Sequence, residues 1–294
     1  MEKIILCPVC KENKLTHFIS CTDYVATNEV FNLDQCVACG FVFTNPRPEF
    51  ENCGKYYESD KYVSHKDNDK SLVLFLYRWV RNRNLYWKLK IISKHQHGNG
   101  ELLDYGCGLG NFLNFCKEKG WKSTGMDVSE NARNVVKERY NIDVYPNAEI
   151  TKQENNKYDV ITLWHVLEHV YDLDETILEF HRILKTDGTL FIAVPNRKSY
   201  DATYYKEKWD AYDVPRHIYH FSPSDMDLLM DRLGFKVIEK RGMFYDAFYV
   251  SMRSEMHSGK GMKLLRGLYR GLISNIKASG NLNYSSMLYV IKKK

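Results

Sequence analysis

Two patterns of apolar positions divide the chain. From residue 101 onward, short apolar runs alternate with segments whose apolar residues recur at helical spacing. The runs predict strands at 101–105, 121–127, 142–145, 158–164, 189–194, 235–239 and 286–292. The segments between them predict helices at 110–119, 129–140, 172–184 and 224–233. Strands that alternate with helices are typical of an α/β protein with a doubly wound parallel sheet.

The residues before this region predict two further parts. Residues 1–48 hold paired cysteines, an apolar strand and a final Asn-Pro-Arg-Pro break, so we interpret them as a small module. We interpret residues 49–98 as a linker and lid segment that contains a long amphipathic helix, Ser71–His95. Residues 99–294 then form the α/β domain, with an irregular insertion at about 196–222 that is rich in aromatic residues and histidine.

Composition narrows the class of protein without identifying a partner. The 294 residues, 44% of them hydrophobic, suffice for one α/β domain and a small module. The formal net charge of +5 tolerates an anionic partner but does not require nucleic acid. No apolar run reaches the length of about eighteen residues that predicts a membrane span, and the apolar start is too short for a signal peptide. We therefore expect a cytoplasmic protein; its oligomeric state is not predicted.

The cysteine pairs at the start of the chain predict a metal site. Cys7 with Cys10, and Cys36 with Cys39, form two C-x-x-C turns, and the segment between them predicts a hairpin. Structural zinc prefers four thiolates from two such turns in a tetrahedral arrangement. We predict a zinc ion held by these four cysteines. Two unrelated reduced pairs, or a redox-active pair, are the alternative.

A glycine turn after the strand at 101–105 is the strongest functional signal. Asp104 stands at the end of this strand, and the three alternate glycines of 106–110 remove every Cβ that would keep a ligand from the backbone. Asp127 ends the next strand and is placed to accept hydrogen bonds from ribose hydroxyls, or else to cap the following helix. Asn111 stands where a dinucleotide-binding turn has Gly or Ala, which disfavours a pyrophosphate ligand.

Four segments together resemble the class I S-adenosylmethionine-dependent methyltransferases. They are Leu102–Gly110, Gly125–Asp127, Tyr158–Val170 and Leu184–Leu190, and the likeness covers roughly residues 55–294. The resemblance implies a seven-stranded Rossmann-like sheet and S-adenosylmethionine as the cofactor. It implies that the glycine turn and residues 164–165 lie at the methionine end of the cofactor, 127–128 at the ribose and 147–149 at the adenine. The implied contacts are Asp104, Gly106, Cys107, Gly108, Gly110, Asp127, Val128, Ala148, Glu149, Trp164 and His165.

The cysteine module in front of the α/β domain indicates a particular group within these methyltransferases. Cys36–Cys39 followed by Thr44–Pro48, and the segment Asp213–Ser222, are similar to a bacterial group linked to sugar or surface-polysaccharide modification. This implies a small-molecule or carbohydrate acceptor that is methylated at oxygen. An RNA methyltransferase is the first alternative, but the first 50 residues lack a clustered basic stripe, so we do not expect nucleic acid as a partner. A non-catalytic, cofactor-binding interaction protein is the second.

A hydroxyl acceptor needs a base or a metal, and histidine is the natural base at neutral pH. We predict His217 as this base, with His169 and His220 as further candidates. Helical spacing places His165, Glu168 and His169 on one face. This group is similar to the Glu-x-x-Glu-His magnesium site of ubiquinone-pathway and small-RNA O-methyltransferases, where another histidine arrives from a position like that of His217. Because His165 replaces the first glutamate, a softer metal on these four residues, no metal, and a purely structural role remain open.

An aromatic segment before the long helix predicts a lid. Tyr56, Tyr57, Tyr62 and His65 are placed to close over the cofactor, with ordinary packing as the alternative.

Two later segments carry weaker signals. Trp209, Tyr212 and Arg216 suit a sugar or phosphate, since aromatic faces and a guanidinium bind such groups, although packing of a long insertion explains them as well. We interpret the basic stretch Lys260–Lys277 as a solvated amphipathic helix that packs on the sheet. Peripheral contact with an anionic membrane is its alternative.

Overall fold

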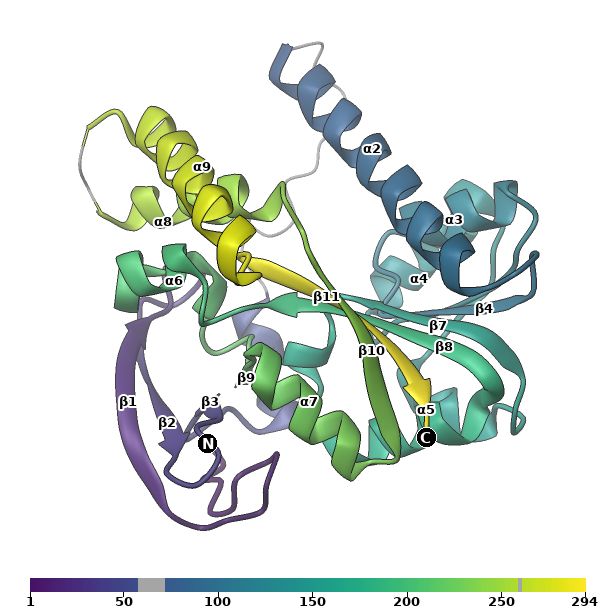
Figure 1. Cartoon of the computed structure of the whole chain (residues 1–294), viewed down its shortest axis with the longest axis horizontal. Coiled ribbons are helices and arrows are strands. Elements are labelled where there is room, and N and C mark those ends of the chain that lie inside the picture. Colours follow the sequence, from purple (N-terminus) through teal and green to yellow (C-terminus); the bar gives the residue numbers. More distant parts are fainter. Residues whose placement is uncertain (58–71, 259–260) are drawn as a thin grey trace.

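A seven-stranded mixed sheet forms the centre of the protein. The computed structural model describes residues 1–57, 72–258 and 261–294. Its large sheet has the order β10-β11-β8-β7-β4-β5-β6 (Figure 1), and β11 is antiparallel to both neighbours while the β8-to-β6 strands are parallel. The strands are β4 (Glu101–Tyr105), β5 (Lys122–Met126), β6 (Val144–Tyr145), β7 (Tyr158–Trp164), β8 (Leu184–Pro195), β10 (Phe235–Gly242) and β11 (Ser286–Lys293). This confirms the predicted α/β class, with one strand reversed.

Helices cover both faces of the sheet. Alternate strand residues point to opposite faces, so Leu102 packs with α2 and α3, whereas Leu103 packs with α5 and α7. Figure 1 shows these helices in two layers, with the sheet between them. Five of these helices match predicted ones to within two residues. Their bounds are α2 (Leu72–His95), α3 (Asn111–Glu118), α4 (Glu130–Tyr140), α5 (Leu173–Ile183) and α7 (Pro223–Arg232).

Local signals explain why these helices begin where they do. The Ser129 side chain accepts a hydrogen bond from the Ala132 N–H at 3.2 Å and so caps α4. Ser222 and Asp225 form a reciprocal capping box at the start of α7, with Pro223 at its first position. Each cap is encoded within four residues, which is why sequence alone places these boundaries closely.

The N-terminal residues form a second, four-stranded sheet that is completed by a distant segment. β1 (Leu15–Thr22), β2 (Val30–Cys36) and β3 (Val42–Thr44) are joined by β9 (Tyr219–His220), which pairs with β3. The insertion at 196–222 was predicted to be irregular, but part of it has regular structure. It holds α6 (Tyr200–Tyr205), the short 3-10 helices η5 (Lys206–Lys208) and η6 (Asp210–Tyr212), and β9. The cysteine-containing sheet and the insertion thus form one hydrogen-bonded unit.

The predicted basic helix is present, but it does not pack as expected. α9 (Lys263–Asn281) runs beside α8 (Asp246–Ser258), a helix that the sequence analysis missed, and the two form a hairpin above the sheet (Figure 1). The side of α9 that meets α8 carries small residues, and its large apolar residues are exposed. Packing of the apolar face on the sheet was therefore the wrong expectation. In the residues that the structure describes, no helix is long and apolar enough to cross a bilayer.

The structure describes only part of the predicted lid. Tyr62 and His65 lie outside the described residues. Tyr56 is buried against Phe31, at 5.6 Å between ring centroids, and donates a hydrogen bond to Glu29. Tyr56 is therefore part of the packing of the N-terminal sheet, which supports the alternative reading for this residue.

Candidate functional site

An open cleft lies at the carboxyl ends of β4 and β7, where the order of the parallel sheet reverses. Parallel α/β sheets bind ligands at such a switch point. The cleft has about 930 Å³ of empty space, including the space open to solvent. Five predicted cofactor residues line it together with residues of α2 and α3. The lining is Asn84, Leu85, Lys88, Asp104, Gly106, Cys107, Gly108, Asn111, Phe112 and Trp164.

The glycine turn has the conformation that this cleft requires. Gly106 and Gly108 have φ angles of +73° and +52°, which L-residues with a side chain rarely adopt. A Cβ on Gly106 would clash with Val166, whereas a Cβ on Gly108 would meet no described atom within 4 Å. Gly106 therefore allows the turn to pack against the segment after β7, and Gly108 keeps backbone exposed to the cleft.

This difference gives a prediction for two alanine variants. We expect Gly106→Ala to lower the free energy of unfolding by about 2–4 kcal/mol, because it adds a clash to an unfavourable φ. Gly108→Ala should cost only about 1 kcal/mol, but it should weaken S-adenosylmethionine binding at least about tenfold because its methyl group enters the cleft. Denaturant unfolding and calorimetric titration measure the two effects. Equal stability of Gly106→Ala and the unmodified protein would contradict this role of Gly106.

Asp104 is buried at the base of the cleft. Its Oδ1 accepts a hydrogen bond from the Thr162 hydroxyl at 2.7 Å. Burial raises the pKa of the Asp104 carboxyl to about 6, although Thr162 and the Lys88 charge oppose the shift. A cationic ligand in the cleft would favour the ionised form further, so Asp104 suits a cofactor that carries an ammonium and a sulfonium charge.

Asp127 supports the turn and keeps acceptor capacity. Its Oδ2 accepts the Gly108 N–H at 2.8 Å and its Oδ1 accepts the Ser129 N–H at 2.9 Å. A carboxylate has about four lone-pair sites, so both oxygens retain capacity for ribose hydroxyls. Ser129 caps α4, whereas Asp127 stabilises the glycine turn through the Gly108 N–H.

Lys88 was missed by the sequence analysis. It comes from α2, and its Nζ lies 4.1 Å from the centre of the Trp164 ring, inside the cleft. Burial lowers the pKa of the Lys88 amine to about 8, although Asp104 and Asp246 oppose the shift. No local motif distinguishes this lysine from the other basic residues of the same helix, so only the tertiary structure reveals it.

The other predicted cofactor residues lie outside the lining of the cleft. Gly110 precedes α3 and packs against Val136, where a Cβ would come within 2.7 Å. Val128 is exposed next to Asp127. Ala148 and Glu149 lie in η3 (Asn147–Lys152), after β6. Their contacts with the ribose and the adenine remain predictions.

A cluster of three side chains lies beside the glycine turn. Glu168 and His169 belong to η4 (Leu167–His169), which follows β7, and His217 comes from the insertion. Their ligand atoms lie within 4.8 Å of one another. Because Val166 packs on Gly106, this segment adjoins the part of the cleft predicted to hold the methyl group. The structure thus brings together three of the four residues predicted for a second metal site.

The two histidines of the cluster each have one ring nitrogen directed at the backbone. His169 Nδ1 donates to the Arg216 carbonyl at 2.9 Å, and His217 Nδ1 donates to the Ala211 carbonyl at 2.8 Å. Because carbonyls only accept, these contacts place the protons on Nδ1 and leave both Nε2 atoms with a lone pair. This arrangement is typical of histidines that bind a metal or accept a proton.

Glu168 is the third member and is fully buried. Neither of its carboxylate oxygens accepts a hydrogen bond from a residue that the structure describes. Its Oε1 lies 3.5 Å from His165 Nδ1 and 3.9 Å from His217 Nε2. Burial opposes ionisation, yet the neighbouring histidines hold the pKa of Glu168 below its usual value. A buried carboxylate of this kind fits a cation or a protonated imidazole as its partner.

His165, the fourth predicted ligand, does not join the cluster. Its Nε2 lies 3.1 Å from Asp246 Oδ2, and its Nδ1 faces Glu168, so carboxylates occupy both ring nitrogens. Although burial disfavours the charged form, these two carboxylates raise the pKa of His165 to about 10. The predicted set of four ligands is therefore corrected to three: His165 is not among the residues whose ligand atoms converge, and its partner is Asp246, which the sequence analysis missed.

His220 also falls outside the cluster. It lies in β9, it is buried, and its Nε2 shares a hydrogen bond with the Thr44 hydroxyl at 3.1 Å. Burial, with the His217 and Arg197 charges, lowers the pKa of His220 well below its usual value. This geometry gives His220 a structural role between β3 and β9 in place of the predicted catalytic one.

The four predicted zinc ligands converge at the end of β2. The Sγ atoms of Cys7 and Cys39 lie 3.5 Å apart, as do those of Cys10 and Cys36, and all four sulfurs lie within 4.8 Å of one another. Sulfurs in a tetrahedral site with Zn–S bonds of about 2.3 Å are about 3.8 Å apart. The donor set and spacing therefore fit zinc. Cys21, Cys53, Cys107 and Cys116 are free thiols, as predicted.

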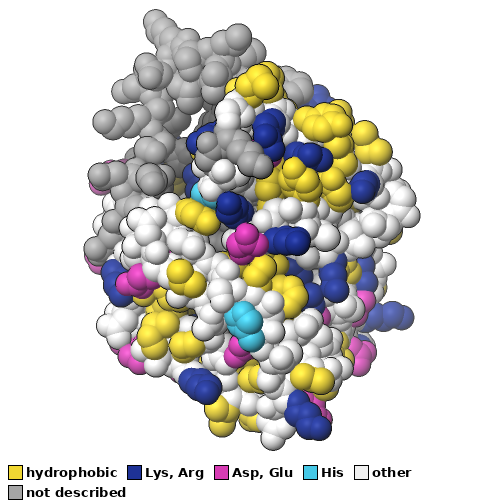
Figure 2. Space-filling view, turned by 90° about the vertical axis from the view of Figure 1, so that its left-hand side faces the viewer, with side chains coloured by type: hydrophobic (Ala, Val, Ile, Leu, Met, Phe, Trp, Pro, Cys, Tyr) yellow, Lys and Arg dark blue, Asp and Glu magenta, His cyan; other side chains and the backbone are white. Residues whose placement is uncertain are grey.

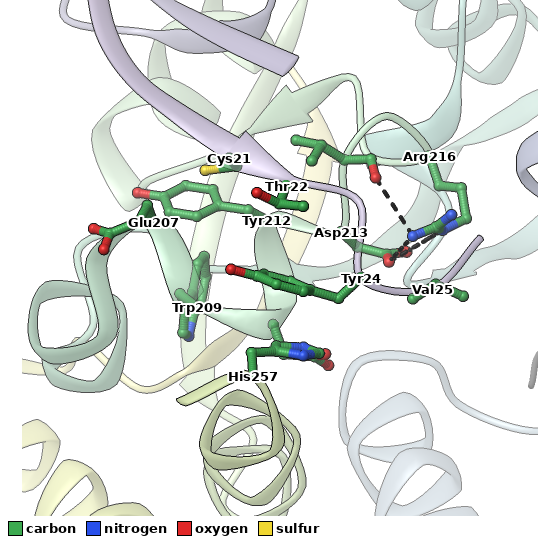
Figure 3. Close-up of a pocket in the computed structure, with 12 residues that line it drawn as sticks. Cys21, Thr22, Tyr24, Val25, Glu207, Trp209, Tyr212, Asp213, Arg216 and His257 are labelled. Carbon is green, nitrogen blue, oxygen red and sulfur yellow. Dashed lines mark hydrogen bonds and ion pairs between the residues drawn. The ribbon is translucent and has the colours of Figure 1, made fainter. Parts of the chain in front are cut away.

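The proposed sugar or phosphate residues line a different pocket. Trp209, Tyr212 and Arg216 border about 260 Å³ of empty space between β1, the insertion and α8 (Figure 3). All three are at most 4% exposed. The Arg216 guanidinium is already bound by Asp213 and Asp23, at 2.6 Å and 3.0 Å. This observation favours packing over ligand binding for these residues.

The fold and the cleft define a class of protein. A parallel sheet with β11 reversed, a glycine turn at the switch point, and acidic residues near the end of β4 and directly after β5 together form a site for a nucleoside cofactor.

Comparison with known proteins identifies the family. Residues 77–240 match a family model described as a methyltransferase domain. The chain belongs to this methyltransferase family, and it is an S-adenosylmethionine-dependent methyltransferase of class I.

Individual relatives are similar over most of the α/β domain. The ubiquinone biosynthesis O-methyltransferase of Rickettsia canadensis is 28% identical over 205 residues, which cover 65% of this chain and 87% of that protein. A probable S-adenosylmethionine-dependent methyltransferase of Mycolicibacterium smegmatis is 23% identical over 176 residues, which cover 58% of this chain but only 64% of that protein.

Solved structures share the fold at lower identity. A putative sarcosine dimethylglycine methyltransferase from Galdieria sulphuraria has a TM-score of 0.51 and 18% identity, and the match covers 76% of this chain and 88% of that one. A methyltransferase from Archaeoglobus fulgidus has a TM-score of 0.50 and 18% identity, with coverage of 76% and 100%.

Proposed function

We propose that this enzyme transfers the methyl group of S-adenosylmethionine to a hydroxyl oxygen of a small molecule or carbohydrate. The Glu168–His169–His217 cluster beside the glycine turn carries this proposal, because a hydroxyl is poorly acidic and requires such a group to lose its proton. The similarity to a ubiquinone biosynthesis O-methyltransferase supports oxygen as the methylated atom. The sequence resemblance of the cysteine module and of Asp213–Ser222 to the polysaccharide-associated group supports a carbohydrate acceptor.

The cofactor supplies an electrophilic methyl group, and the protein aligns the acceptor with it. Asp104, the backbone at 106–108 and Asp127 would hold the cofactor in the cleft. When bound, the cofactor would supply this methyl group to an acceptor oxygen aligned with the carbon–sulfur bond, and the electron pair of the broken bond would leave with S-adenosylhomocysteine.

His217 takes the hydroxyl proton in this mechanism. Its Nε2 has a free lone pair, because Nδ1 donates to the Ala211 carbonyl. Glu168 Oε1, 3.9 Å away, stabilises the imidazolium that forms. His169 also has Nδ1 directed at a backbone carbonyl, although the Tyr57 hydroxyl lies 3.2 Å from the same nitrogen. Its ring centroid lies 4.6 Å from that of His217, so His169 is the second candidate.

The same cluster fits a divalent cation. Two imidazole nitrogens and the Glu168 carboxylate, whose Oε1 also faces His165 Nδ1, are a donor set for zinc, manganese or iron rather than magnesium, which prefers oxygen ligands. Glu168, His169 and His217 would hold such an ion, and its charge would lower the pKa of an acceptor hydroxyl. In that case the three side chains are ligands, and the free Nε2 atoms serve coordination.

Product formation with a panel of acceptors tests the proposed function. We expect S-adenosylhomocysteine release to rise above the background with nucleotide sugars, glycans or small hydroxylated compounds, and to stay at background with RNA. RNA as the only productive acceptor would overturn the acceptor class. The fold and the cofactor cleft would be unaffected by that result.

A further inference from the structure

The outer face of α9 is an apolar surface with no described part of the chain covering it. Its exposed residues are between 40% and 64% exposed: Leu264, Leu265, Leu268, Tyr269, Leu272 and Ile276. Figure 2 shows hydrophobic side chains gathered on this side of the molecule, with Lys and Arg among them. Monomeric proteins rarely expose a contiguous apolar patch of this kind without a partner.

The contacts of the opposite face fix this orientation. A Cβ on Gly267 would come within 2.5 Å of Met252 Cα, and one on Gly271 within 2.8 Å of the Ala247 carbonyl oxygen. Ser274 donates to Asp201 at 2.7 Å, and Asn275 donates to the Phe244 carbonyl at 2.9 Å. The helix cannot turn its leucines inward without losing this close packing, so their exposure is built into the fold.

Basic residues predominate across α9, which carries the patch, and its neighbour α8 taken together. Between residues 243 and 282 the sequence has two acidic residues, Asp246 and Glu255. Both point inward: Asp246 lies 3.1 Å from His165 Nε2, and the Glu255 side chain is 1% exposed and pairs with Arg266.

The basic residues of α9 stand at the border of the apolar face. Lys263 is at its start, the Arg270 guanidinium stacks 4.0 Å from the Tyr204 ring, and Lys277 Nζ lies 4.1 Å from the Tyr200 ring. The patch therefore combines apolar side chains with an uncompensated positive border.

We propose that α9 binds the surface of an anionic lipid bilayer, with its leucine face in the boundary between headgroups and acyl chains. An apolar stripe flanked by Lys and Arg is the composition of interfacial helices. A second copy of this chain is a poorer occupant, because the same positive border would face itself across a symmetric interface. Anionic headgroups neutralise this border, at a gain of about 1 kcal/mol for each lysine or arginine at the surface.

Vesicle co-sedimentation with the full chain tests the proposal. We expect binding to vesicles of phosphatidylglycerol and phosphatidylcholine, and at least about tenfold weaker binding to phosphatidylcholine alone. The double variant Leu265→Glu/Leu272→Glu should bind the anionic vesicles at least about tenfold more weakly, because two leucines that would enter the bilayer surface are replaced by charges. Lys263→Ala should weaken binding about fivefold.

A matched control tests whether the loss of vesicle binding is specific to the α9 surface or follows from any exposed leucine that is replaced by glutamate. Leu178 on α5 is 51% exposed, so Leu178→Glu makes the same change elsewhere and should leave vesicle binding unchanged. Circular dichroism and calorimetric titration with S-adenosylmethionine verify that each variant is folded and binds cofactor.

Three results would overturn the proposal. The first is an absence of binding to anionic vesicles, and the second is an equal loss of binding in Leu178→Glu. The third is a dimer in analytical ultracentrifugation that Leu265→Glu/Leu272→Glu dissociates, since a second copy would then cover the face.

Discussion

Replacing His217 with alanine is expected to lower the rate of methyl transfer by about 100- to 10,000-fold, with S-adenosylmethionine affinity unchanged. The expected range is that of a lost general base. It rests on the free Nε2 of His217 beside Glu168, and on the place of the cluster next to the glycine turn. His217 does not line the cofactor cleft, so cofactor binding should survive the change.

Three further variants sharpen this experiment. His97 is exposed and distant in sequence, so His97→Ala is the matched control and should retain full activity. His217→Asn keeps a donor near the position of Nδ1 for the Ala211 carbonyl but has no basic nitrogen, and should be as inactive as the alanine variant. Glu168→Gln removes the buried charge and should reduce the rate as well. Full activity of His217→Ala would contradict the proposed role of the cluster.

Chelation distinguishes the two ways in which the cluster can act. If Glu168, His169 and His217 hold a cation, EDTA should abolish methyl transfer and a divalent transition metal should restore it. If His217 acts as a base alone, a chelator that leaves the cysteine site intact should have no effect. Metal analysis before and after treatment shows which site has lost its ion.

If Cys7, Cys10, Cys36 and Cys39 hold zinc, as their convergence indicates, its loss is expected to have a second large effect. Structural zinc contributes about 10–16 kcal/mol to the folding of small zinc domains, as much as the whole stability of an ordinary domain. We therefore expect Cys36→Ser to unfold the N-terminal sheet, to remove the zinc and to lower methyl transfer by at least about 100-fold. Elemental analysis, thermal unfolding and the activity assay measure these three consequences.

The contacts that explain this effect run from the cysteines to His217. β2 ends at Cys36 and pairs with β3, and β3 pairs with β9. At the end of β3, the Thr44 hydroxyl donates to the His217 carbonyl at 2.9 Å, and the Thr44 N–H donates to the Ile218 carbonyl at 3.0 Å. The N-terminal sheet thus holds the backbone of the candidate base.

Two controls separate positioning from simple unfolding. Cys53 is a free thiol outside the cluster, so Cys53→Ser should retain zinc and activity. Thr44→Val keeps the shape and the zinc but removes both side-chain hydrogen bonds of Thr44, to the His217 carbonyl and to His220 Nε2, and should lower the rate about tenfold without loss of metal. A zinc-free protein with unchanged methyl transfer would show that the cysteine module does not position His217.

The parts that the sequence predicted well are those encoded locally. The glycine turn, Asp104 and Asp127 follow from strand ends and spacing, and the structure places them at one switch point. The cysteine pairs converge because each C-x-x-C turn presents both of its sulfurs on one side. In each case a few adjacent residues specify both the conformation and the chemistry.

The parts that the sequence analysis missed depend on distant partners. Asp246 pairs with His165 across 81 positions, and Lys88 enters the cleft from a helix with many similar residues. β9 has two residues, too few for any periodicity, and it forms only because β3 offers an edge. The side that α9 exposes was set by the small residues facing α8, a helix that was not predicted.

The position of the transferred methyl group tests the central claim most directly. The measurement is mass spectrometry of products formed from S-adenosylmethionine with an isotopically labelled methyl group and the productive acceptor. The account predicts the label on a hydroxyl oxygen of a small molecule or carbohydrate, and its loss with His217→Ala. Label on nitrogen or carbon, or on RNA, would contradict the account.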